Sequence, residues 1–230
     1  MESRDIVLKL FAATRLVAAL LGLIAVAATF ADTGSRTAIN PFNFFGFFTM
    51  QSNILAAVIF LTAAIWGLTG RERSAGLELA RGCATAYMII VGLVYNLLLA
   101  GLPGGVDLPW ANNVLHIVIP IYAAVDWLFF ADRSALPWNR FWVVVVYPMV
   151  WVVVVLIRGA TDGWVPYPFL DPATGYGAVA LYAVGIAVGI AAFGALVWAV
   201  SRVRILDPGS DGRADVRVVP QRNRTGSPGV

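Results

Sequence analysis

Charged residues are scarce in this chain of 230 residues, since Asp, Glu, Lys and Arg make up 13% of it and hydrophobic residues 60%. Soluble domains carry about 25% charged residues, so this balance excludes a soluble globular class. The apolar residues form six runs of roughly 20 residues, the length a helix needs to cross a hydrocarbon core. The strands of a β-barrel would show apolar residues that alternate with a period of two, and this sequence does not. The sequence predicts an all-α membrane protein, a bundle of six transmembrane helices.

Cysteine, histidine and lysine each occur once, as Cys83, His116 and Lys9. A single cysteine excludes a disulfide framework, and one Cys with one His cannot complete a zinc or iron site. We therefore expect no metal and no cofactor. The other fifteen basic residues are arginines, a bias typical of GC-rich bacterial genomes. The expected location is the bacterial inner membrane, a plasma membrane.

Six spans are predicted over residues 6–30, 42–68, 81–101, 110–130, 141–157 and 175–203. This divides the chain into a cytoplasmic N-terminus (1–5), a transmembrane domain (6–204) and a cytoplasmic tail (205–230). The tail is rich in Gly, Pro and charge, so we expect it to be disordered. The first span is long for a secretory signal, and we expect it to be retained.

Basic residues are distributed unevenly among the connections between the spans. Arg71, Arg73 and Arg81 flank the second connection and Arg133 and Arg140 the fourth, whereas the third has none. The positive-inside rule then places both termini in the cytoplasm and the odd-numbered connections outside. The net charge is +3, but the basic residues lie in the connections and the tail, where they report orientation, so we expect no nucleic-acid partner.

Polar residues interrupt two of the apolar spans, in FFTMQSN (47–53) and NNVLHIVIP (112–120). Polar groups inside a bilayer are costly and are more often functional than accidental. Thr49 lies about seven residues into its span and His116 about six, which places both roughly 10 Å below the outer interface. Asn96, near the outer end of the third span, is expected at the same level.

Helical spacing groups these side chains further, because residues three or four apart share a face. The predicted faces contain Thr49, Ser52 and Asn53 on the second span, and Asn112, Asn113 and His116 on the fourth. Pro120 follows His116 by four residues, so it removes the hydrogen bond to the His116 carbonyl and bends the helix. We expect a free carbonyl and space for a substrate or water there.

A threonine hydroxyl and a neutral imidazole can act together as nucleophile and general base. Asparagine amides can donate to a developing oxyanion or orient the ring. Asp126 lies about 15 Å deeper than His116, so the prediction is a Thr49–His116 dyad and no triad. Ser52 is an alternative nucleophile. The competing interpretation is structural: the Thr49 hydroxyl bonds a carbonyl one turn earlier, and the asparagines join neighbouring helices through hydrogen bonds.

Arg15 and Asp126 form a second intramembrane set, at nearly matching depths on the first and fourth spans. Buried charges in membranes pair as a rule, so we predict an ion pair that holds these helices in register. A proton or ion path is the alternative interpretation.

The segments FFTMQSN and NNVLHIVIP resemble the Thr- and His-containing segments of the androgen-induced and androgen-dependent TFPI-regulating family of membrane threonine hydrolases. The chain is most similar to the family's bacterial six-pass relatives. The resemblance implies a six-helix fold over about residues 6–204 and cleavage of fatty acid esters of hydroxy fatty acids. It further implies Thr49 as the nucleophile and His116 as the base.

Three functions follow as hypotheses. The first is a membrane-embedded esterase, whose lipid ester enters from the bilayer with its acyl chains against Phe42, Phe44, Phe45, Phe47 and Phe48. The second is a small proton-coupled transporter with a relay through Arg15, Asp126 and His116. The third is a non-catalytic membrane scaffold. For the esterase, the expected partners are the lipid substrate and the membrane lipids.

Overall fold

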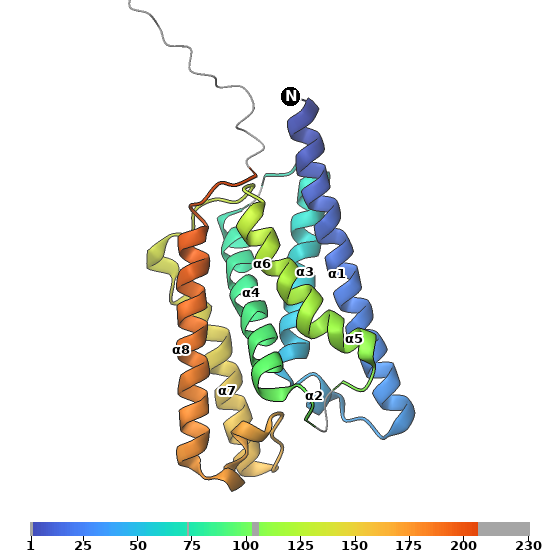
Figure 1. The fold of residues 1–230 in the computed structure, drawn as a ribbon, viewed down its shortest axis with the longest axis vertical. Coiled ribbons are helices and arrows are strands. Elements are labelled where there is room, and N and C mark those ends of the chain that lie inside the picture. The colour runs from blue at the N-terminus through green and yellow to red at the C-terminus, as the bar shows by residue number, and fades with distance from the viewer. Residues whose placement is uncertain (1, 73, 103–105, 207–230) are drawn as a thin grey trace, which may run out of the picture.

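The computed structural model describes residues 2–72, 74–102 and 106–206, and it shows helices joined by short connections (Figure 1). Six helical spans are long enough and apolar enough to cross a membrane. Among the described residues the only β-type pairing is an isolated bridge. The predicted all-α, six-span class is therefore confirmed, and the chain is a multi-pass membrane protein.

The long helices pack as neighbours in an antiparallel bundle. They are α1 (Glu2–Arg36), α3 (Phe48–Leu68), α4 (Ala75–Val94), α6 (Ile119–Phe129), α7 (Val143–Thr161) and α8 (Tyr176–Val200). Helix α3 lies between α1 and α4, α4 also packs on α6 and α8, and α7 lies against α8. The start of α1 and the end of α8 lie at one end (Figure 1). The opposite end, formed by residues 37–47 and 162–175, is called the distal end below.

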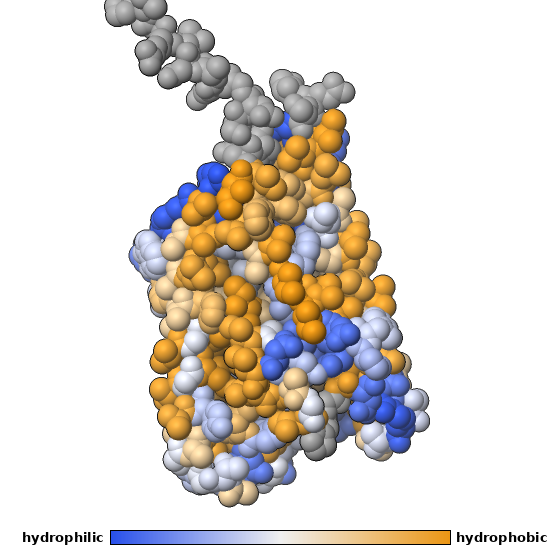
Figure 2. Space-filling view, in the orientation of Figure 1, coloured by the Kyte–Doolittle hydropathy of each residue, from blue (hydrophilic) through white to orange (hydrophobic). Residues whose placement is uncertain are grey.

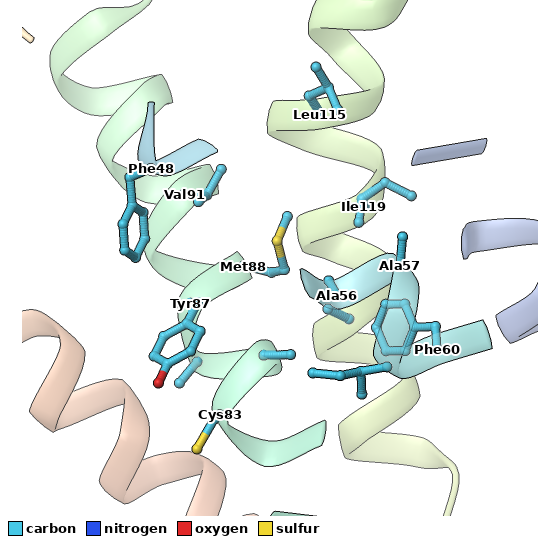
Figure 3. Close-up of a cluster of buried hydrophobic side chains, with 14 of the residues drawn as sticks. Phe48, Ala56, Ala57, Phe60, Cys83, Tyr87, Met88, Val91, Leu115 and Ile119 are labelled. Atoms are coloured by element: carbon cyan, nitrogen blue, oxygen red, sulfur yellow. The ribbon is translucent and has the colours of Figure 1, made fainter. Parts of the chain in front are cut away.

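A core of apolar side chains joins α3, α4 and α6 (Figure 3). Small residues let the helices approach closely. A Cβ on Gly67 would lie 2.9 Å from Ala12 Cβ, and one on Gly82 would lie 2.5 Å from a methyl carbon of Leu136. Figure 2 shows hydrophobic residues over most of one face, with hydrophilic residues around the distal end of α1 and, at the upper left, near the opposite end of the bundle.

The predicted second span, 42–68, is two helices and not one. The first is the single turn α2 (Pro41–Phe44), whose Asn40 side chain accepts hydrogen bonds from the next backbone amides. The chain then turns at residues 45–47, where a Cβ on Gly46 would lie 2.5 Å from the Trp164 ring. Thr49 is consequently in the first turn of α3, and the prediction that it lies seven residues down a continuous helix is wrong.

The third and fourth spans each contain a π-helical segment at the distal end, η1 (Tyr95–Leu99) and η2 (Val114–Val118). In η2 the Ile119 amide bonds the carbonyl of Val114, five residues earlier. The absent amide of Pro120 explains the wider turn, because the regular ladder cannot continue through it. The short helix α5 (Pro109–Asn113) precedes η2.

The ends of several elements differ from the predictions. Helix α1 runs past both ends of the predicted span 6–30, so residues 2–5 belong to its first turn. Three 3₁₀ turns occupy connections, η3 (Trp138–Arg140), η4 (Pro168–Leu170) and η5 (Pro172–Thr174).

The first two residues of the predicted tail, 205 and 206, are described by the structure. Leu206 is ordered, because its amide donates to the Phe129 carbonyl at 3.0 Å and its carbonyl accepts from the Ala131 amide at 3.3 Å. The remainder of the predicted tail, 207–230, lies outside the described residues.

Buried charges near the N-terminal end form a network across α1, α4 and α6. Arg15 Nε lies 2.6 Å from Asp126 Oδ1, which is the predicted ion pair, and Arg15 Nη1 lies 2.6 Å from Asp132. Arg81 lies 2.9 Å from Asp126 and 3.0 Å from Glu78. Buried charges are stable in a membrane only when they are paired, and each charged side chain of this network has an oppositely charged partner.

Candidate active site

The Thr49 hydroxyl is buried in the first turn of α3 but does not make the usual backbone hydrogen bond. The carbonyls that it was expected to use are occupied. The Phe45 carbonyl accepts from Gln51 Nε2 at 2.8 Å and the Gly46 carbonyl from Trp151 Nε1 at 2.9 Å. Other threonine hydroxyls within the long helices do bond back to a carbonyl three or four residues earlier, for example those of Thr14, Thr29, Thr62, Thr85 and Thr161. The structural alternative required a hydrogen bond from the Thr49 hydroxyl to a carbonyl one turn earlier, and this bond is absent among the described residues.

Tyr167, in the connection between α7 and α8, is the polar partner of the Thr49 hydroxyl. Its hydroxyl oxygen lies 3.5 Å from Thr49 Oγ1 and accepts a hydrogen bond from the Thr49 amide at 3.3 Å. Burial raises the pKa of Tyr167, so the hydroxyl keeps its proton and can donate it. The sequence patterns did not identify this residue.

The His116 ring is held in one orientation by its own span and by η1. Its Nδ1 lies 3.1 Å from the Asn112 carbonyl oxygen, and the ring stacks on Tyr95 with centroids 3.7 Å apart. A carbonyl oxygen only accepts hydrogen bonds, so Nδ1 carries the proton and Nε2 carries the lone pair. The ring is thus in the tautomer that a general base at Nε2 requires.

The His116 carbonyl, released by Pro120, is bonded and not free. Asn96 Nδ2 donates to it at 3.3 Å and also donates to the Gly92 carbonyl at 2.7 Å. A Cβ on Gly92 would lie 3.0 Å from Pro120 Cβ, so glycine allows the two π-helical spans to meet here. The expected break in the helix is present, and it serves to attach η2 to α4.

Asn53 and Asn112 hold the surroundings of the site together. Asn53 Nδ2 donates to the carbonyls of Thr49 at 2.9 Å and Leu115 at 3.2 Å, which joins α3 to η2. Asn112 Nδ2 donates to the Tyr95 hydroxyl at 2.5 Å. Both Oδ1 atoms are buried without a partner among the described residues. Unpaired buried acceptors are costly and call for an explanation, such as a bound water or substrate group.

Two predicted site residues lie apart from the others. Asn113 is exposed, and Ser52 Oγ faces the Tyr147 hydroxyl at 3.4 Å. Neither lines the cavities described next, which is also true of Asn53, Asn96 and Asn112, but those three bond the residues around Thr49 and His116. The helical spacing had placed Asn113 on one face with His116, but His116 lies in the π-helical segment η2, whose wider turn alters the angular register between the two residues.

Thr49 and His116 line the same cavity, of about 380 Å³, at the distal end. We call it the hydroxyl-rich cavity, because its polar lining consists of Thr29, Thr33, Thr37, Asn40, Asn43, Thr49, Tyr95, His116 and Tyr167. Among the described contacts, no hydrogen bond joins Thr49 to the His116 ring. Catalytic contacts are often long in the absence of substrate, and a substrate placed between the two groups could bridge them.

A second cavity of about 380 Å³, the apolar cavity, lies between α4, α7 and α8. It meets the hydroxyl-rich cavity at four shared residues, Thr49, Tyr95, Leu99 and Tyr167. Thr49 is therefore at the junction of a polar space and an apolar one.

The five phenylalanines expected against the acyl chains are divided between different surroundings. Phe48 lines the apolar cavity, whereas Phe44 and Phe47 line the hydroxyl-rich one. Phe42 and Phe45 line neither cavity, and Phe42 is 83% exposed. The turn at residues 45–47 separates these rings, so a single phenylalanine wall does not form.

Comparison with protein-family models, curated proteins and solved structures found no match. Within the described part of the chain no three His, Cys, Asp or Glu side chains are grouped to hold a metal ion. What the site offers is a buried hydroxyl that makes no backbone hydrogen bond, an oriented imidazole with an available lone pair, and a neutral tyrosine donor.

Proposed function

We propose that this protein is a membrane-embedded hydrolase of lipid carboxylic esters, with Thr49 as nucleophile and His116 as general base. The observation that carries the proposal is that both residues line one cavity. The Thr49 hydroxyl is not engaged by the backbone, and the Asn112 carbonyl holds His116 in the tautomer of a base. Fatty acid esters of hydroxy fatty acids belong to the substrate class.

The reaction begins when Thr49 Oγ1 attacks the ester carbonyl carbon while its proton passes to His116 Nε2. The tetrahedral intermediate collapses, the bond to the alcohol oxygen breaks, and His116 returns the proton to that oxygen. Water then attacks the acyl-threonine, giving its proton to His116. As the fatty acid leaves, this proton moves to Thr49 Oγ1 and restores both groups.

In this scheme Tyr167 stabilises the oxyanion. Its hydroxyl is close to Thr49 Oγ1 and keeps its proton, so it can donate to the negative charge that develops on the carbonyl oxygen. Asn53, Asn96 and Asn112 make their hydrogen bonds within the protein. We assign them to positioning Thr49 and His116.

The proposed setting is the bacterial inner membrane, with both termini in the cytoplasm. The charge pattern of the connections supports this orientation. The distal end, and with it the site, then opens at the outer leaflet, where a lipid ester can enter from the bilayer.

The test is ester hydrolysis by the protein purified in detergent, compared with Thr49→Ala, His116→Ala and Thr49→Ser. We expect Thr49→Ala and His116→Ala to lower kcat by about 1,000-fold, as is typical when a nucleophile or its base is removed. Thr49→Ser should retain most of the rate. Thr62→Ala is the matched control, because its hydroxyl only bonds back to the Val58 carbonyl. Wild-type rates in Thr49→Ala or His116→Ala would refute the proposal.

A further inference from the structure

The apolar cavity extends from Thr49 toward the middle of the bundle. Its lining on α8 runs from Ala180 to Ile190, which corresponds to about 15 Å along the helix. Thr49 is at the distal end of α3, beside the distal part of this lining. The cavity volume is in the range of small-molecule sites, roughly 300–1,000 Å³. Its shape and lining suit one extended hydrocarbon chain.

One wall of the apolar cavity is incomplete toward the membrane. Three of its lining side chains on α7 and α8 are also about half exposed, Met149 at 48%, Val153 at 49% and Val184 at 61%. These residues face lipid when the helices span a bilayer. A hydrocarbon chain can therefore enter between α7 and α8 without passing through water.

The hydroxyl-rich cavity on the other side of Thr49 differs in chemistry. Its lining residues include Thr29, Thr33, Thr37, Asn40 and Asn43. No Asp, Glu, Lys or Arg is among the described residues that line either cavity. Arg158 lies behind this lining, where it donates to Asn43 Oδ1 at 2.8 Å, but it is already paired with Asp162. An anionic group placed here would therefore find no unpaired cation among the lining residues, which is costly, whereas hydroxyl groups would find hydrogen-bond partners.

We propose that the apolar cavity binds the fatty acyl chain that is transferred to Thr49, and that the hydroxyl-rich cavity binds an uncharged, hydroxyl-bearing alcohol. The preferred substrates are then long-chain acyl esters of neutral polyols, such as monoacylglycerols. This inference rests on the proposed function. It adds the direction in which the ester is bound and the charge of its alcohol.

The acyl assignment is tested with phenylalanine substitutions along α8. Ala183 and Ala187 both line the apolar cavity, about 10 and 16 Å from the start of the helix. Ala187→Phe should lower kcat/KM for hexadecanoyl glycerol about tenfold, because the chain end loses burial, and leave octanoyl glycerol nearly unchanged. Ala183→Phe should shorten the accepted chain further. Ala192→Phe, exposed and outside the cavity, is the control.

Equal losses on the short and long esters in Ala187→Phe, or the same profile in the control, would overturn the acyl assignment. For the alcohol side, wild-type protein should hydrolyse hexadecanoyl glycerol at least about tenfold faster than a fatty acid ester of a hydroxy fatty acid, which carries a carboxylate. The reverse preference would overturn the assignment of a neutral alcohol.

Binding without turnover separates this inference from the proposed chemistry. Thr49→Ala protein in lipid vesicles is irradiated with a monoacylglycerol that carries a diazirine at the end of its acyl chain. Crosslinks within residues 183–190 of α8 support the acyl cavity, even if the wild-type protein hydrolyses nothing and the proposed function fails. Crosslinks confined to residues 29–43 overturn the orientation, even if hydrolysis is observed.

Discussion

Both ends of the bundle bury polar groups, but the groups at one end are paired charges and those at the other are uncharged and lie beside cavities. At the N-terminal end, Arg15, Arg81 and Asp126 pair with one another and with neighbouring acids at 2.6–3.0 Å. At the distal end, the Thr49 hydroxyl has no backbone partner among the described residues. Single unpaired buried atoms occur at both ends, Arg81 Nε in the charge network and Asn53 Oδ1 near Thr49, so the two ends differ in their charges and cavities. None of the network's residues lines either cavity, whereas Thr49 lines both.

The difference separates two reasons for keeping polar residues inside a membrane. Charges that are mutually paired fix the register of helices, and their value is structural. Groups with unused hydrogen-bonding capacity beside a cavity are available to a substrate. Stability and hydrolysis should therefore depend on different ends of the molecule.

The largest expected effect on stability comes from Asp126→Asn, which leaves Arg15 and Arg81 without their shared carboxylate. We expect the free energy of unfolding in detergent to fall by about 3 kcal/mol, while hydrolysis per folded molecule stays unchanged. Asp32→Asn is the control, since its pair with Arg36 is exposed and contributes less than about 1 kcal/mol. Loss of hydrolysis in fully folded Asp126→Asn protein would contradict the claim that hydrolysis depends only on the distal end. A proton relay through Asp126 would then be favoured.

Tyr167→Phe should have the opposite signature. Removing the hydroxyl leaves the ring packing intact but takes the acceptor from the Thr49 amide, so the free energy of unfolding should fall by about 1–2 kcal/mol, less than in Asp126→Asn. The value of kcat should fall about 30-fold with KM nearly constant, because the donor acts on the oxyanion of the transition state. Steady-state kinetics measure both parameters. A rise in KM alone would place Tyr167 in substrate binding.

Gly92→Ala tests whether the contact between the π-helical spans positions His116. The new Cβ would lie 3.0 Å from Pro120 Cβ and 3.5 Å from the His116 carbonyl oxygen, so η2 must move by a few tenths of an ångström. We expect kcat to fall about threefold, since small misplacements of catalytic groups are costly. Gly177→Ala, where nothing lies within 4 Å of the Cβ, should leave kcat unchanged. Equal rates in the two variants would exclude a positioning role for this contact.

Ser52→Ala should have the smallest effect and decides between the two candidate nucleophiles. Ser52 Oγ faces Tyr147 and lines neither cavity, so hydrolysis should change by less than about twofold. A loss as large as that expected for Thr49→Ala would move the nucleophile to Ser52.

The sequence was sufficient for features that depend on composition and regular geometry. Apolar run lengths predicted six spans, and the scarcity of intramembrane charge predicted the Arg15–Asp126 pair. The turn before Thr49 was missed because it depends on a tertiary contact, the Trp164 ring against Gly46. Tyr167 was missed because a tyrosine in a connection gives no periodic signal, and only folding brings it to Thr49. Arg81 was counted as a connection charge, although it lies inside α4 and pairs with Asp126.

The most direct measurement is covalent labelling with a lipophilic fluorophosphonate, followed by mass spectrometry of the modified peptide. The account predicts a single adduct on Thr49, which is absent in Thr49→Ala and forms at least about 100-fold more slowly in His116→Ala. Modification of Ser52, or no adduct on Thr49 in a preparation that hydrolyses esters, would contradict it.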